Sequence, residues 1–244
     1  MKLVIVRHAD PDYSIDSLTE TGWVEAELLS HRLRKLDVKA FYVSPLGRAK
    51  DTASLTLKAM GREAEECLWL REFDAPIHKP YSDRAYPSVT WDWLPEAWTT
   101  EERYFDRDAW ADTDVMETAR VGEAWKWVAD ELDALLAKHG YVRAGNMYRA
   151  EQPNEDTIVF FCHFGLECVL LSHLLNVSPM VLWHGTCAAP SSVTTLVTEE
   201  RREGKAYFRM SAFGDISHLY VADREPSFAA RFCETFANQD QRHD

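Results

Sequence analysis

The chain has 244 residues, of which 46% are hydrophobic and 27% charged, and this composition excludes collagen-like, low-complexity and intrinsically disordered proteins. A single α/β domain of this length can bury a sizeable core. The 27 Lys and Arg residues face 40 Asp and Glu residues, so the formal charge of −13 disfavours nucleic acid and anionic membranes as partners.

The sequence carries no pattern typical of membrane insertion, export or oxidative folding. No apolar run approaches the ~18 residues of a membrane-spanning helix. The N-terminal run 3–6 stops at Arg7 and His8, too early for a signal peptide. The five cysteines are an odd number without a CxxC pair, so neither a disulfide framework nor a zinc knuckle is indicated. We therefore expect a soluble protein of the cytoplasm.

The first predicted elements are a strand and a helix. Residues 2–6 contain the continuous apolar run 3–6 with three β-branched members, which predicts a buried parallel strand ending near Arg7. Thr19 can cap a helix in which apolar residues recur at three- and four-residue spacing from Trp23 to Leu36. We expect this helix to pack on the sheet.

The same alternation continues to residue 70. A short strand is predicted at 40–43, and Ser44 and Pro45 are predicted to be the N-cap and first residue of a second helix. That helix should run to about residue 60 and end at Gly61. The segment 67–70 is predicted to be a third, short strand.

The stretch 75–127 interrupts the alternation and is predicted to be a helical cap insertion. Six of the nine tryptophans lie from Trp91 to Trp127, and nine acids face two arginines between residues 92 and 117. Two interpretations are open: internal packing with a solvated acidic face, or a substrate lid whose indoles stack on an aromatic or apolar leaving group. A long amphipathic helix over about 117–139 should return the chain to the sheet.

The C-terminal part repeats the strand, loop and helix order. A fourth buried strand is predicted at 158–161 and a helix at 165–175, followed by a hairpin of 193–197 with 206–210. Residues 223–244 are expected to be a peripheral tail. The whole chain is therefore expected to be a single α/β domain, a three-layer α/β/α sandwich with a mostly parallel central sheet.

Polar side chains gather where the predicted strands end. Arg7 and His8 follow the first strand, Arg48 lies in the first turn after the second, Glu72 follows the third and His163 follows the fourth. Open α/β sheets bind ligands at this edge, beside helix N-termini. These five residues are therefore expected to converge on one pocket.

This set of side chains suits phosphoryl transfer. Two guanidiniums can bind a dianionic phosphoryl group, and a neutral imidazole can attack its phosphorus. A carboxyl group can protonate the leaving oxygen and later activate water, for which Glu72 is the candidate and Asp74 the rival. The arrangement requires no metal and no cofactor.

Six short segments match the motif pattern of a known family. The segments are LVIVRHA at 3–9, LTETG at 18–22, SPLGRAKDTA at 44–53, LRE at 70–72, CHFG at 162–165 and GDISHL at 214–219. On these segments the chain resembles the histidine phosphatase superfamily, the phosphoglycerate-mutase-like proteins, over roughly residues 1–75 and 155–220.

The resemblance implies a role for each of the five residues. It implies that His8 is the phosphorylated nucleophile, that Arg7, Arg48 and His163 bind the phosphate, and that Glu72 is the proton donor. This agrees with the chemistry expected from the residues alone.

The sequence departs from the family pattern at three places. Ala9 stands where glycine is commoner, and Phe164 stands where a glycine often follows the second histidine, which should narrow the pocket. The loop 10–14 lacks the asparagine that mutases and many phosphatases place after the first histidine, which weakens a mutase role.

The leading hypothesis is a metal-independent phosphomonoester hydrolase that acts on a small phosphorylated metabolite through a phosphohistidine. A phosphoglycerate-type mutase, which would depend on a bisphosphorylated primer, and a non-catalytic phosphate-ligand or protein-binding module are the alternatives. His173, His184 and His218 are interpreted as structural. A homodimer contact near Trp110 is left open.

Overall fold

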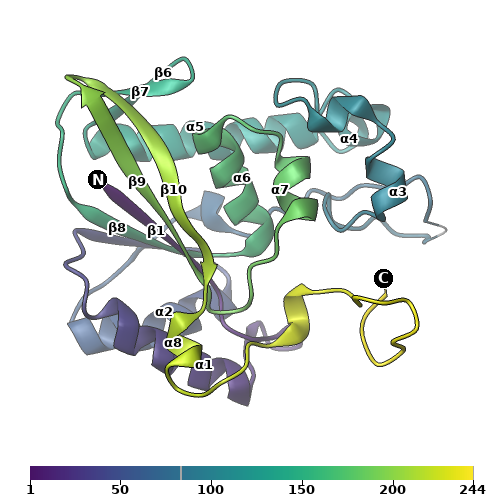
Figure 1. Cartoon of the computed structure of the whole chain (residues 1–244), viewed down its shortest axis with the longest axis horizontal. Helices are drawn as coiled ribbons and strands as arrows, with labels where there is room; N and C mark the ends of the chain where they lie inside the picture. The colour runs from purple at the N-terminus through teal and green to yellow at the C-terminus, as the bar shows by residue number, and fades with distance from the viewer. Residues whose placement is uncertain (83, 244) are drawn as a thin grey trace.

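The computed structural model describes residues 1–82 and 84–243, so Asp83 of the expected cap and Asp244 of the expected tail lie outside it. Its centre is an eight-stranded sheet in the order β5-β4-β8-β1-β9-β10-β7-β6 (Figure 1). The strands are β1 (Lys2–Arg7), β4 (Ala40–Val43), β5 (Glu65–Glu66), β6 (Tyr141–Ala144), β7 (Met147–Ala150), β8 (Thr157–Cys162), β9 (Val193–Arg202) and β10 (Lys205–Asp215).

The strands that end at the predicted site run parallel. β1 and β4 both pair in parallel with β8, and β5 pairs in parallel with β4. On the other side of β1 the sheet continues antiparallel through β9, β10, β7 and β6. Two of these antiparallel pairs, β9 with β10 and β6 with β7, are joined by short hairpins, which cannot connect parallel neighbours.

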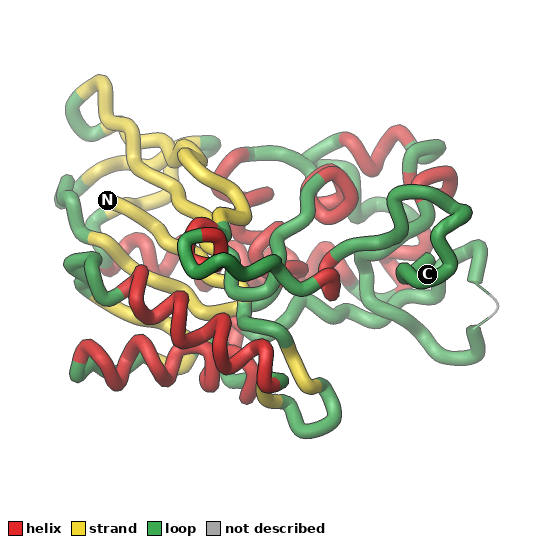
Figure 2. The backbone as a smooth tube through the Cα atoms, turned by 60° about the horizontal axis from the view of Figure 1, so that its bottom comes forward, coloured by secondary structure: helices red, strands yellow, loops and turns green. Residues whose placement is uncertain are grey.

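Helices cover both faces of the sheet, so the predicted three-layer α/β/α sandwich is confirmed (Figures 1 and 2). In β1, Leu3 and Ile5 pack into the core on one face and Val4 and Val6 into the core on the other. The second core contains α1 (Glu20–Leu33) and α2 (Gly47–Met60), and the first contains α5 (Val121–Lys138), α6 (Phe164–Leu175) and α7 (Pro179–Gly185). This alternation explains why the central strands are apolar throughout.

The first helix forms as predicted at its N-terminus but buries a different residue. The Thr19 hydroxyl accepts a hydrogen bond from the Gly22 N–H at 3.0 Å and caps α1. Trp23 is 38% exposed instead of buried. Gly22 takes the inward position because a Cβ there would lie 2.2 Å from the Asp10 carbonyl oxygen.

The second helix begins two residues later than predicted. The N-cap is Leu46, and the Ser44 hydroxyl contacts the His163 ring and accepts from the Leu46 N–H. The Gly47 N–H is bonded instead to a carboxylate from a distant loop, that of Asp16. The helix ends at Gly61 in the left-handed conformation, φ 62°, as predicted.

The predicted strand at 67–70 is wrong. The strand β5 is the preceding Glu65–Glu66, and Leu68–Leu70 forms a short 3-10 helix, η1. Trp69 and Leu70 are both buried, whereas neighbouring residues of a strand face opposite sides of the sheet. The turn lets both side chains enter the same core, and it brings the chain to Glu72.

The segment 75–127 contains only short helices before α5. These are α3 (Pro95–Trp98), η2 (Glu102–Phe105) and α4 (Asp114–Thr118). The expected long helix starts at Val121 and not near residue 117, because Arg120 has a left-handed backbone with φ 52°. Trp110 is buried against Trp125 and Trp183, so its own indole does not lie on the surface.

Three features of the remaining chain were not predicted from the sequence. A hairpin of β6 and β7 turns at Gly145, φ 64°, and extends the sheet. A small two-stranded sheet of β2 (Pro11–Asp12) and β3 (Ser17–Leu18) lies outside the main one. After α8 (Ser217–Tyr220), the tail with η3 (Phe228–Ala230) folds back toward α3 (Figure 1).

No helix in the described part of the chain is both long and apolar enough to cross a membrane.

Candidate active site

Strand pairing brings the two predicted site histidines together. Arg7 of β1 lies opposite Cys162 of β8 in the parallel register, so His8 and His163 follow neighbouring strand ends. Their ring centroids are 5.1 Å apart, and both side chains are buried. The parallel register is therefore the reason that residues 155 positions apart share one site.

The environment of His8 keeps one ring nitrogen free of a proton. Its Nδ1 lies 2.8 Å from the Ala9 carbonyl oxygen, which can only accept, so the neutral ring carries its proton on Nδ1. Burial, followed by the charges of Arg7 and Arg48, lowers the pKa of His8 well below its ordinary value. The Nε2 lone pair is consequently available at neutral pH.

His163 lies where α6 begins. Its Nε2 is 2.7 Å from the Ser44 hydroxyl, and its buried Nδ1 has no hydrogen-bond partner among the described residues. Burial, together with the neighbouring His8 and the two guanidinium charges, lowers the pKa of His163 well below the ordinary value. The ring is neutral and retains one nitrogen for a bound group.

The two arginines are held by different parts of the chain. The Arg7 guanidinium donates to the Ala188 carbonyl oxygen. The Arg48 guanidinium donates to the Asp16 carboxylate at 2.6 Å and lies 5.3 Å from the ring centroid of Tyr13. Each arginine keeps a buried Nε without a partner in the described structure.

Glu72 lies at the N-terminus of α6. Its Oε1 accepts hydrogen bonds from the N–H groups of Phe73, at 2.8 Å, and Leu166, at 2.9 Å. Burial raises the pKa of Glu72 even though these bonds and the guanidinium charges oppose the change. The rival Asp74 is exposed and pairs with Arg71 at 3.2 Å, so it belongs to the surface.

The CHFG segment, residues 162–165, packs closely against Trp91 and Glu72. A Cβ on Gly165 would lie 2.4 Å from the Trp91 Nε1 and 2.7 Å from the Glu72 Oε1, so only glycine fits there. Phe164 is 8% exposed, and its ring centroid lies 5.8 Å from the Arg7 guanidinium carbon. Its ring therefore forms a wall of the site, which supports the expected narrowing.

The five predicted residues share one electrostatic neighbourhood. The charges of Arg7 and Arg48 act on the pKa of His8, of His163 and of Glu72. Three buried nitrogens, the Nε atoms of the two arginines and the Nδ1 of His163, have no partner among the described residues, and unsatisfied buried polar groups are costly. An anion with several acceptor oxygens would satisfy such a cluster.

A metal site is not evident in the described parts of the chain. No group of three or more His, Cys, Asp or Glu side chains there is arranged to hold a metal ion.

Comparison with known families identifies the superfamily of the chain. The model of the histidine phosphatase superfamily (branch 1) matches residues 3–208. The chain belongs to this superfamily. The resemblance inferred from the six sequence segments is thereby confirmed. A search of curated proteins found no match.

Solved structures of histidine phosphatases share the fold at low sequence identity. A phosphoserine phosphatase from Entamoeba histolytica in complex with phosphoserine is 18% identical, with a TM-score of 0.60 over 89% of this chain and 98% of that one. A mycobacterial glucosyl-3-phosphoglycerate phosphatase is 20% identical, with a TM-score of 0.54 over 87% of this chain and 98% of that one.

Several site residues of this histidine phosphatase were missed in the sequence. Ser44 was interpreted as a helix cap, although it directly follows a strand that ends at the site. Thr52 also supports the site, since its hydroxyl accepts from the Ala9 N–H at 2.9 Å. Asp16 gave no local signal, because its partners Gly47 and Arg48 lie some thirty residues away.

The three histidines that were interpreted as structural from the sequence each contact another group of the protein. His173 pairs with Asp133 at 2.9 Å, and His218 is bonded to the Ser191 hydroxyl at 3.0 Å. His184 is bonded to the backbone at both ring nitrogens.

Proposed function

We propose that this histidine phosphatase hydrolyses a phosphomonoester through a phosphohistidine at His8. The observation that carries the proposal is the buried pair of neutral imidazoles beside two guanidiniums with unpartnered donors. The cluster offers a nucleophile and a phosphate site in one place. The matched family model supports this chemistry.

In the first step the phosphoryl group moves from the ester to His8. A bond forms between Nε2 and phosphorus while the bond from phosphorus to the ester oxygen breaks. Arg7, Arg48 and His163 stabilise the charge on the three other phosphoryl oxygens. Glu72 gives its proton to the leaving alcohol, and both of its backbone hydrogen bonds use Oε1, which leaves Oε2 to carry that proton.

In the second step water releases phosphate. Glu72, now ionised, accepts a proton from the water as its oxygen bonds to phosphorus and the bond to Nε2 breaks. The raised pKa of Glu72 suits both directions of transfer, because the group gains and loses a proton nearer neutral pH than an exposed glutamate does. The protein returns to its starting state without a cofactor.

The substrate is proposed to be a small phosphorylated metabolite, with residues 75–127 acting as the cap over the site. The structural neighbours named for phosphoserine and for glucosyl-3-phosphoglycerate support a small substrate. A mutase remains the alternative, and the loop after His8 disfavours it because residues 10–14 contain no asparagine.

The proposal is tested with 4-nitrophenyl phosphate in the presence of a metal chelator. The parent should release phosphate and form an acid-labile phosphoprotein. His8→Ala should lose both, with turnover reduced at least ~10³-fold. His31→Ala, which removes an exposed histidine on α1, is the matched control and should behave as the parent does.

The other outcomes separate the alternatives. Phosphohistidine without turnover would favour the mutase, whose isomerising activity would then depend on a bisphosphorylated primer. Phosphate binding with neither labelling nor turnover would favour the non-catalytic module. Activity that is lost in chelator and restored by a divalent metal would contradict the metal-independent step.

A further inference from the structure

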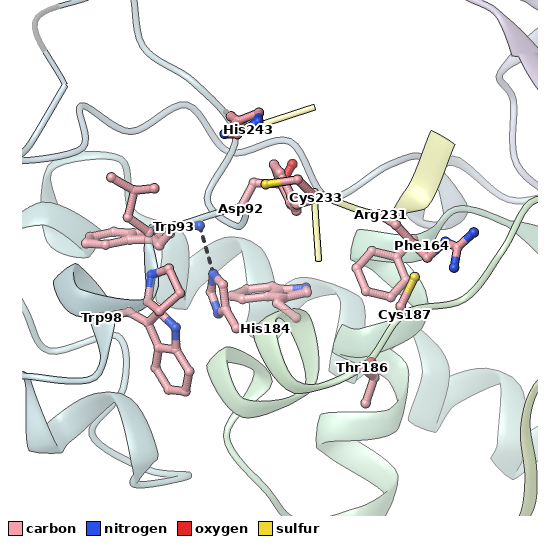
Figure 3. A pocket seen from close by; sticks show the side chains of 14 residues that line it. Asp92, Trp93, Trp98, Phe164, His184, Thr186, Cys187, Arg231, Cys233 and His243 are labelled. Carbon is pink, nitrogen blue, oxygen red and sulfur yellow. Dashed lines mark hydrogen bonds between the residues drawn. The ribbon is translucent and has the colours of Figure 1, made fainter. Parts of the chain in front are cut away.

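A cavity lies directly beside the phosphate-binding cluster. It has a volume of about 480 Å³ and is bordered by the segment 92–98, by α7 and by the C-terminal tail (Figure 3). Phe164, which directly follows His163, and Cys187 line the end nearest the cluster. Arg7 lies behind this end, since it contacts the Phe164 ring and donates to the carbonyl oxygen after Cys187. The cavity therefore begins one residue away from the phosphoryl-transfer site.

The walls of the cavity present ring surfaces whose hydrogen-bond donors are already used. The Trp93 indole N–H donates to the Thr90 carbonyl oxygen at 2.7 Å. The Trp183 indole N–H donates to the Gly165 carbonyl oxygen at 2.9 Å. Both indoles are buried. These walls offer apolar contact area to an occupant and few polar contacts.

His184 adds a neutral aromatic wall. Its Nε2 accepts from the Trp93 backbone N–H at 3.0 Å, so its Nδ1 carries the proton and donates to the Met180 carbonyl oxygen at 2.7 Å. Burial lowers the pKa of His184 to about 4. The ring stacks on Trp98 with centroids 5.0 Å apart, and the two lie together at one end of the cavity (Figure 3).

The tail forms the outer wall of the cavity. Phe232, Cys233 and His243 line it, and the Arg242 guanidinium pairs with the Asp92 carboxylate at 2.7 Å. That ion pair joins the tail to the insertion and neutralises the carboxylate at the cavity edge. The tail, which was expected to be peripheral, thus encloses the space next to the site.

We propose that this cavity is the leaving-group subsite and that the substrate is a phosphomonoester of an alcohol bearing an aromatic group. The inference rests on the proposed function and narrows its substrate class. A sugar or other polyhydroxylated alcohol would place hydroxyls against the ring faces of Trp93, Trp183 and His184, where they would lack partners, at a cost in binding. Thr186 and Arg231 are polar residues that also line the cavity, and Arg231 lies at its Phe164 end (Figure 3). A planar apolar group would instead pack against the ring surfaces that line the cavity, those of Trp93, Trp98 and Phe164 among them.

The lid hypothesis from the sequence is thereby made more specific. Trp93 and Trp98 line the cavity, whereas Trp91 donates to the Phe73 carbonyl oxygen and packs over Gly165. Trp91 therefore supports the catalytic carboxyl group, and the substrate contact is assigned to the other two indoles.

The test compares two phosphonates that cannot be hydrolysed, 3-phenylpropylphosphonate and propylphosphonate, by titration calorimetry. They carry the same phosphoryl group and differ only in the ring. The parent should bind the phenyl compound about tenfold or more tightly, because burying a ring transfers its apolar surface from water. The kcat/KM values of 2-phenylethyl phosphate and ethyl phosphate, whose alcohols have similar acidity, should differ in the same direction.

A substitution in the cavity wall tests whether the preference for the phenyl compound arises in this cavity. Trp98→Ala should remove most of the preference for the phenyl compound while leaving the affinity for propylphosphonate unchanged. Trp23→Ala, which removes a partly exposed indole on α1, is the matched control and should keep the preference. If Trp98→Ala does not fold, the preference of the parent for the phenyl compound tests the subsite assignment by itself.

Equal affinities for the two phosphonates in the parent, or a preference that survives in folded Trp98→Ala, would overturn the subsite assignment. The proposed function would still stand in that case if phosphohistidine forms. Absence of phosphonate binding together with absence of phosphohistidine would overturn both.

Discussion

At the scale of single residues, the carboxyl group of Glu72 is subject to opposing effects. Removal from water favours its protonated form, whereas two backbone N–H groups and the nearby guanidinium charges favour its ionised form. Burial prevails and raises the pKa. The balance matters because the proposed reaction uses both forms of the same group.

Glu72→Gln should therefore slow hydrolysis most for substrates whose leaving oxygen must be protonated. We expect kcat/KM to fall by about 10²–10⁴-fold for an alkyl phosphate, the range typical of a lost general acid, and far less for 4-nitrophenyl phosphate, whose leaving group departs without protonation. The decline of kcat/KM at high pH should also disappear in the variant. Equal losses on both substrates would contradict the role of proton donor.

Glu167 is a second buried carboxyl group, one turn after His163 on α6. It is 1% exposed, and neither of its oxygens has a close hydrogen-bond partner in the described structure, although the Thr194 hydroxyl opposes the effect of burial on its pKa. Burial raises its pKa from 4.5 to about 7. The folded state therefore holds this proton more tightly than the unfolded chain does. The proton's contribution to the stability of the fold is fully present below pH 4.5 and is lost as the pH rises through about 7.

Glu167→Gln should be more stable than the parent at pH 8, by up to ~3 kcal/mol, since the amide is never ionised. The two proteins should have similar stability at pH 4.5. Urea unfolding at both pH values measures this difference, and Glu27→Gln, which changes an exposed acid on α1, is the control. A variant less stable than the parent at pH 8 would refute the assignment.

At the scale of elements, the N-terminus of α2 is completed by a loop distant in sequence. The Asp16 carboxylate accepts from the Gly47 N–H at 2.7 Å and from Arg48 at 2.6 Å. Asp16 has a left-handed backbone, φ 48°, which turns its carboxylate and carbonyl toward the helix. The loop therefore both caps α2 and orients an arginine of the site.

Gly47→Ala should disrupt this contact. The new Cβ would lie 2.0 Å from the Asp16 carbonyl oxygen, and a backbone atom cannot move aside without shifting the loop. We expect a loss of ~2 kcal/mol in stability and a fall in kcat/KM of about tenfold as Arg48 loses its support. In the control Gly185→Ala, the added Cβ meets nothing within 4 Å, so its stability should be nearly unchanged. Parent-like kinetics in Gly47→Ala would show that the loop does not orient the arginine.

At the scale of the whole molecule, the insertion and the sheet share one hydrophobic core. Trp93, Trp110 and Met116 of the insertion are buried in the same cluster as Ile5 and Phe160 of the central strands. Such a core has no internal boundary at which the insertion could unfold separately. The arrangement favours a single cooperative unit.

Urea unfolding should therefore show one transition. The midpoint from tryptophan fluorescence, to which the six indoles between residues 91 and 127 contribute, should coincide with the midpoint from far-ultraviolet circular dichroism. A fluorescence midpoint at distinctly lower urea would mean that the insertion unfolds first and forms a domain of its own.

Much of the fold, and the convergence of the five candidate site residues at one edge of the sheet, could be predicted from the sequence because the signals are local. An apolar run ends at Arg7, a threonine caps α1, a glycine ends α2, and the motif residues stand next to predicted strand ends. The errors arose where burial overrode a local pattern. The segment 67–70 formed a turn so that two adjacent side chains could enter one core.

The tertiary structure alone decided how distant segments meet. The pairing of Asp16 with Arg48, the burial of Glu167 and the cavity between the insertion, α7 and the tail have no local pattern. Periodicity and capping depend on neighbours within a few residues. Ion pairs, desolvation and cavities instead depend on which surfaces come together after the chain has folded. Short motifs therefore indicate the chemistry of the site. The shape of the cavity that is proposed to select the leaving group results from long-range packing.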